Sequence, residues 1–205
     1  MLILSDLLSS NYFYRPTRLA LAVLVISLII NAVIGVSIIL VGDFDGTDGK
    51  VLMTATSLAI FSIISLPSFF HIERRRYVHL SVAGIITALI LYGLVVLAIW
   101  GKGSDNEILF KTIASLGILA IGTNHALLML IATPTNILIS ICQRLTLGII
   151  VIVGAILQIV VWTEEMHDMM ARILGVLVII DVLGTILVPM LSRMFRTPVS
   201  QDQNT

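Results

Sequence analysis

Apolar residues run along the chain in six long blocks, which short polar stretches separate and which show no alternation of apolar and polar positions. A helix needs about 20 mostly apolar residues to cross the hydrocarbon core, whereas outer-membrane strands would give segments of about ten residues with a period of two. The pattern predicts an all-α, polytopic membrane protein, a bundle of six transmembrane helices arranged as three hairpins. The predicted spans are 19–41, 52–70, 78–100, 112–131, 145–162 and 173–191.

The two ends of the chain differ from these blocks. Residues 1–15 place three leucines on one helical face before an aromatic run, and lack the basic start of a signal peptide. They are predicted to form an interfacial segment, the alternative being a frayed terminus. Residues 16–196 are the predicted six-helix transmembrane domain, and residues 197–205 a flexible C-terminal tail.

The composition agrees with a membrane protein. Hydrophobic residues make up 58% of the chain and charged residues 12%, against about 45–50% and about 25% in soluble domains. This excludes a soluble enzyme, a disordered chain and a nucleic-acid-binding protein, and the single cysteine excludes a disulfide framework. The expected partners are the lipid bilayer and a membrane protein or a second copy of the chain, with no nucleic acid.

The few charges predict an orientation. With both termini on one side, that side holds eight Lys/Arg residues and the other side four. Short loops rich in Lys/Arg face the cytoplasm, so both termini are predicted to be cytoplasmic. The arginine bias and the absence of a cleavable signal favour a bacterial inner (plasma) membrane.

Arg74, Arg75 and Arg76 form a basic run between the second and third spans. Its simplest role is to fix topology. Such residues also attract anionic lipid head groups, by about 1 kcal/mol each.

A period of 61 residues links the hairpins. Lys50, Lys111 and Arg172 stand 61 residues apart, each at the outer start of the second helix of a hairpin. A pseudo-threefold repeat would explain this. Three unrelated hairpins of ordinary length would give a similar period, so both interpretations stay open.

One charged residue, Asp181, lies well inside a predicted span. A carboxylate at mid-bilayer costs about 2.5–3.5 kcal/mol on insertion scales, so it usually faces a partner or a water-filled cavity. Counted at about 1.5 Å per residue, Asn31 lies at a similar depth. The two side chains are predicted to meet in one layer.

A deeper polar layer is predicted from His125, Thr87, Ser27 and Thr185, at about 20 Å from the outer side. Polar side chains that bond across closely packed helices explain it most simply. The alternative is a proton or ion path through His125 and Asp181. His71, at the interface, is expected to be solvated.

Helix-start signals lie in the outer loops. Thr47, Ser104 and Thr163 are expected to cap the helices that follow, and Ser104 and Glu107 fit a capping box. Glu107 and Lys111 have the spacing of a helical ion pair. The fifth span is expected to begin its helix near Asn136.

No enzyme, metal or cofactor signature is found, because nucleophile motifs, phosphate loops and paired intramembrane carboxylates are missing from the sequence. The expectation is a non-catalytic protein without cofactor or metal, a subunit or scaffold of a membrane assembly that acts through helix packing. The alternative is a small ion- or proton-coupled transporter or channel that uses Asp181 with Asn31 and His125.

Overall fold

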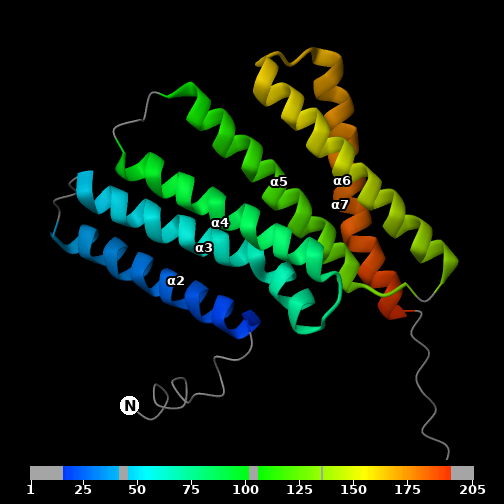
Figure 1. The fold of residues 1–205 in the computed structure, drawn as a ribbon, viewed down its shortest axis with the longest axis horizontal. Helices are drawn as coiled ribbons and strands as arrows, with labels where there is room; N and C mark the ends of the chain where they lie inside the picture. The colour runs from blue at the N-terminus through cyan, green and yellow to red at the C-terminus, as the bar shows by residue number, and fades with distance from the viewer. Residues whose placement is uncertain (1–15, 42–45, 102–105, 135, 195–205) are drawn as a thin grey trace, which may run out of the picture. The chain divides into compact units, whose positions relative to one another are not determined.

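The computed structural model describes residues 16–41, 46–101, 106–134 and 136–194, and these form six helices and no strand. The helices are α2 (Pro16–Val41), α3 (Gly46–Glu73), α4 (Val78–Trp100), α5 (Glu107–Ile131), α6 (Ile137–Thr163) and α7 (Asp168–Met194) (Figure 1). All six are long and apolar enough to cross a membrane. The all-helical, six-span prediction is confirmed, and the chain has the character of an integral, multi-pass membrane protein. The predicted segments 1–15 and 197–205 lie outside the described residues.

Five of the helices extend beyond the predicted spans, and this changes the expected caps. Thr47 lies inside α3 rather than before it. Thr163 is the last residue of α6, where its Oγ1 donates to Ile159 O at 2.9 Å. A threonine hydroxyl at a helix end can donate to the carbonyl four residues back instead of accepting a free N–H from the next helix. Both cap predictions were therefore wrong, Thr47 because α3 already includes it and Thr163 because it ends α6. The start of α6 is confirmed, because the Asn136 side chain accepts from Leu138 N at 3.4 Å.

The described helices fall into two compact units, and the division lies inside α5. The first unit ends at Leu127 and the second begins at Leu128. In the first unit α3 packs against both α2 and α4, and in the second α6 packs against α7 (Figure 1). The predicted pairings within the first and third hairpins are therefore present.

Small residues line the α3–α4 contact of the first unit. The buried positions of α4 are Ser81, Gly84 and Ala88, and most of those of α3 are alanine or serine. Small side chains let membrane helices approach closely. At the far end of the pair, Trp100 Nε1 donates to Thr54 Oγ1 at 2.9 Å, which ties the end of α4 to the start of α3.

Larger apolar side chains form the centre of the second unit. Its buried cluster consists of Met129, Ile139, Ile150 and Val188. Elsewhere on both units, large apolar side chains are exposed. Hydrocarbon solvates apolar side chains as well as a protein core does, so this exposure is the expected surface of a membrane-spanning bundle.

The second helices of the three predicted hairpins begin at Gly46, Glu107 and Asp168, and successive starts lie 61 residues apart. Lys50, Lys111 and Arg172 thus each stand four residues after a helix start. The helix boundaries keep the period found in the sequence, and a triplicated origin stays a prediction.

Candidate functional site

Asp181 lies half-buried on α7, and its Oδ1 is shielded from solvent. One turn later, Thr185 Oγ1 donates to the backbone carbonyl of Asp181 at 2.8 Å. Asn31, on α2, accepts from Thr56 Oγ1 of α3 at 3.4 Å. Asp181 belongs to the second unit and Asn31 to the first, so their meeting in one layer stays a prediction.

The deeper layer divides in the same way. Thr87 Oγ1 donates to Ala83 O of its own helix at 2.8 Å, and His125 is half-buried on α5. Both lie in the first unit, whereas Thr185 lies in the second. A path through His125 and Asp181 therefore also stays a prediction.

Buried polar contacts of the first unit are made by Asn124, the residue before His125. Ser68 Oγ of α3 donates to Asn124 Oδ1 of α5 at 2.5 Å, and Asn124 Nδ2 donates to Ala120 O at 2.9 Å. Gly84 of α4 faces this pair. A Cβ there would lie 2.7 Å from Ser68 Oγ. The absence of a side chain at position 84 therefore makes room for the hydrogen bond.

His71 lies about one turn of α3 after Ser68 and forms a second contact between α3 and α5. Its Nε2 lies 2.9 Å from Leu127 O of α5, and the residue is 1% exposed. A carbonyl only accepts, so Nε2 is the donor in this contact. Nδ1 is buried and has no hydrogen-bond partner among the described residues. The expectation of a solvated His71 was wrong, because α5 covers the ring.

Ser68, His71 and Asn124 are called the α3–α5 cluster below. Sequence reasoning missed it, although a signal was present: residues 62, 65, 68 and 71 are polar at a spacing of three, and all four are buried. Successive members of this row are neighbours on the helix surface, each about 60° from the last, so the row turns gradually around α3.

A corresponding contact in the second unit centres on Gln143 of α6. Its Nε2 donates to Met129 O at 2.7 Å and to Ala132 O at 3.0 Å. These carbonyls belong to the end of α5 and the residue after it, where the helix leaves acceptors without partners of its own. One buried amide therefore binds both acceptors at the end of α5.

The closest approach within the second unit lies between α6 and α7. A Cβ on Gly184 would lie 2.1 Å from Thr146 Oγ1, and Thr146 is itself buried. Thr146 Oγ1 donates to Cys142 O at 3.0 Å. The site is therefore a packing contact whose hydroxyl is already bonded within its own helix.

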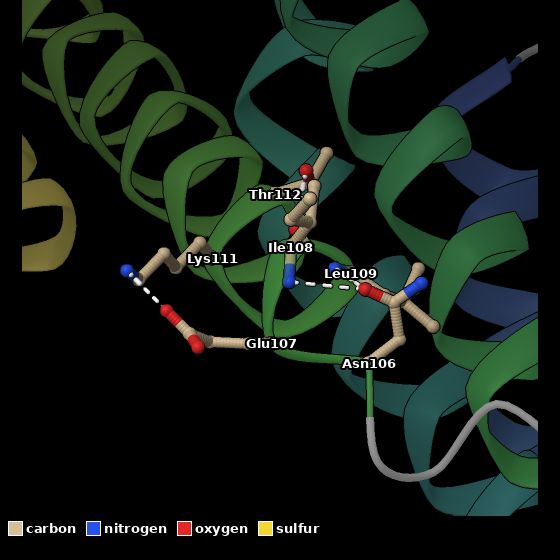
Figure 2. Close-up of polar contacts among 6 residues, drawn as sticks. All are labelled: Asn106, Glu107, Ile108, Leu109, Lys111 and Thr112. Carbon is tan, nitrogen blue, oxygen red and sulfur yellow. Dashed lines mark hydrogen bonds and ion pairs between the residues drawn. The ribbon is translucent and has the colours of Figure 1, made fainter.

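The start of α5 carries the predicted cap chemistry in a different register (Figure 2). Asn106 Oδ1 accepts from Ile108 N at 3.1 Å and from Leu109 N at 3.3 Å. The predicted cap, Ser104, lies outside the described residues. The Glu107–Lys111 pair is confirmed at 2.6 Å.

Titratable groups do not gather into a metal site within the described ranges, where no group of three or more His, Cys, Asp or Glu side chains is placed to hold an ion. His167 and Glu165, in the loop before α7, lie 3.9 Å apart and are exposed.

Comparison with known proteins adds no name to this arrangement: no family model, no curated protein and no solved structure matches the chain.

Proposed function

We propose that this chain is a non-catalytic integral membrane protein that serves as a subunit or scaffold of a membrane assembly through helix packing. One observation carries the proposal: the buried polar side chains Ser68, His71 and Gln143 all bond to neighbouring helix elements. A polar group that already bonds a helix is not available to a solute. The partners would be the lipid bilayer and another membrane protein or a second copy of the chain.

The proposed location is a bacterial inner (plasma) membrane with both termini in the cytoplasm, which the arginine bias of one side supports. Labelling of single cysteines, introduced into a Cys142→Ser variant, tests this orientation. Arg75→Cys should react with an impermeant maleimide only after the cells are opened, whereas Glu165→Cys should react in intact cells. The reverse pattern would invert the topology.

Two measurements on the native chain test the scaffold proposal. Extraction into polymer-bounded native discs should retain a partner or a second copy at a fixed stoichiometry. The purified chain in liposomes should carry no proton or cation flux above protein-free liposomes. A monomer without a partner would contradict the proposal, and so would a specific flux.

The alternative, a small ion- or proton-coupled transporter or channel, is favoured by Asp181. A half-buried carboxyl group in the middle of α7 is costly in a bilayer and is typical of ion pathways. Asn31 and His125 would line such a path.

The matched pair Asp181→Asn and Asp168→Asn separates the two functions. Both changes neutralise one carboxylate of α7, but Asp168 is exposed at the helix start. A flux that Asp181→Asn abolishes and Asp168→Asn preserves would establish the transporter and overturn the scaffold. Absence of flux from all three proteins would remove the transporter.

A further inference from the structure

Three consecutive arginines occupy the turn between α3 and α4, here called the arginine turn (residues 74–77). Its backbone is tightly bonded: Arg74 N donates to Phe70 O at 3.2 Å and Arg76 N to His71 O at 2.9 Å. Arg75 and Tyr77 both have left-handed backbone conformations, with φ of 51° and 52°. The arginine side chains therefore project from a defined turn rather than from an extended loop.

Aromatic rings hold two of the three guanidinium groups. Arg74 Cζ lies 4.2 Å from the ring centroid of Phe70, and Arg76 Cζ lies 5.5 Å from that of Tyr77. Both distances are within the range of cation–π attraction. A guanidinium placed against an aromatic ring has a restricted position, and its N–H groups have the fork geometry that fits a phosphate.

No carboxylate neutralises these arginines in the part of the chain that the structure describes. The nearest acid in sequence, Glu73, accepts the backbone N–H of Thr17 at 3.1 Å. The arginines themselves are exposed. The turn therefore presents three exposed arginine side chains that form no ion pair within the described residues.

The position of the turn decides which anion it meets. It joins two helices of membrane-spanning length, so it lies at the height of the lipid head groups. Tyr77 is also the N-cap of α4 and makes no side-chain cap hydrogen bond. The positive end of the α4 dipole therefore adds to the field of the arginines.

We propose that the arginine turn binds the head-group phosphate of an anionic phospholipid, with Arg74 and Arg76 as its two oriented donors. A lipid phosphate satisfies the guanidinium edges while its acyl chains lie along the exposed apolar surfaces of α3 and α4. This inference does not depend on whether the chain acts as a scaffold or as a transporter.

Lipid titration of the detergent-solubilised chain, followed by native mass spectrometry, tests the site. Phosphatidylglycerol should bind more tightly than phosphatidylcholine. The pair Arg74→Gln/Arg76→Gln should weaken binding of the first phosphatidylglycerol by about twenty-five-fold, at about fivefold per arginine. The matched pair Arg144→Gln/Arg172→Gln removes two exposed charges elsewhere and should weaken it less than about threefold.

Two further arms keep the test decisive. Arg74→Lys/Arg76→Lys keeps the charge but loses the planar fork, and should bind phosphatidylglycerol more weakly than the native chain; this pair also serves if the glutamine pair fails to fold. Equal losses in the two glutamine pairs, or no loss in the lysine pair, would overturn the oriented site. Tight binding of soluble glycerol phosphate would overturn the lipid as its source.

Discussion

The two units bind their helices with different chemistry. In the first unit, Ser68 of α3 bonds to Asn124 of α5, and His71 of α3 bonds to the backbone of α5. In the second, the buried cluster is apolar, and a single amide, Gln143, bonds the end of α5. Interhelical hydrogen bonds in membranes contribute about 0.6 kcal/mol on average. The first unit should therefore depend on several small polar terms, and the second on close packing.

This difference has a structural origin in the helices' buried faces. Ser65, Ser68 and His71 recur on one side of α3, so any helix packed there meets hydroxyl and imidazole groups. The buried face of α6 carries Ile150 and Thr146, and Thr146 packs closely against Gly184 of α7. Substitutions that remove hydrogen bonds should thus act mainly on the first unit, and substitutions that add volume mainly on the second.

The largest expected effect is at His71. His71→Ala should lower the free energy of unfolding by about 3 kcal/mol, because it leaves a cavity in a buried site and removes the hydrogen bond between the ring and the Leu127 carbonyl. Unfolding with SDS in mixed micelles measures it. His79→Ala, at an exposed position, is the control and should stay within about 0.5 kcal/mol of the native chain.

A second variant tests the assigned proton. His71→Gln places an amide N–H near the position of Nε2, so it should retain more stability than His71→Ala. Equal losses in His71→Ala and His79→Ala would mean that the buried ring does not hold α3 to α5.

Gly184 provides the next largest effect and tests the packing of the second unit. Gly184→Ala should cost about 2 kcal/mol, since its Cβ would overlap Thr146 Oγ1 and the helices must move apart. Gly175→Ala, on the same helix, has open space around the new Cβ and should be neutral or stabilising by up to about 1 kcal/mol. Thermal unfolding in detergent compares the two.

Relief of the overlap makes this prediction specific. Adding Thr146→Ala to Gly184→Ala removes the hydroxyl and methyl groups that the new Cβ meets, so part of the loss should return. If the two glycine variants were equally stable, the α6–α7 contact would not be as close as described.

A smaller effect separates a bonded serine from an unbonded one on α3. Ser68→Ala removes the hydrogen bond to Asn124 and should cost about 0.6 kcal/mol. Ser65 Oγ is buried without a partner among the described residues, so Ser65→Ala should be neutral or stabilising. SDS unfolding of both variants measures the difference. A larger loss at Ser65 would reverse the roles assigned to the two hydroxyls.

The helices were predictable from sequence and the α3–α5 cluster was not, for physical reasons. A span is a property of about 20 consecutive residues, so hydropathy alone locates it. Burial of one side chain depends on which helix covers it, as His71 illustrates: it lies at the end of a span, where a solvated imidazole is the ordinary expectation. The meeting of Asp181 and Asn31 depends on helix rotation in the same way.

Helix ends were predicted less well than spans, because polar side chains can either cap or continue a helix. Thr47 and Thr163 have the residue type of a cap but lie inside α3 and α6. The start of α5 followed the expected chemistry with Asn106 as the cap residue. The Glu107–Lys111 pair was correct because spacing alone places those side chains together.

Substitution of the Glu107–Lys111 pair gives the smallest expected effect on stability. Because the pair is on the surface, it is a reference for the losses at the buried sites His71 and Gly184. Glu107→Gln should cost about 0.3 kcal/mol, because Glu107 is 72% exposed and water screens the attraction. The loss should shrink further in about 1 M salt, where the Debye length is about 3 Å, whereas the losses at His71 and Gly184 should persist. Unfolding curves at two salt concentrations measure both. If the His71→Ala loss also fell with salt, surface charge rather than burial would hold α3 to α5.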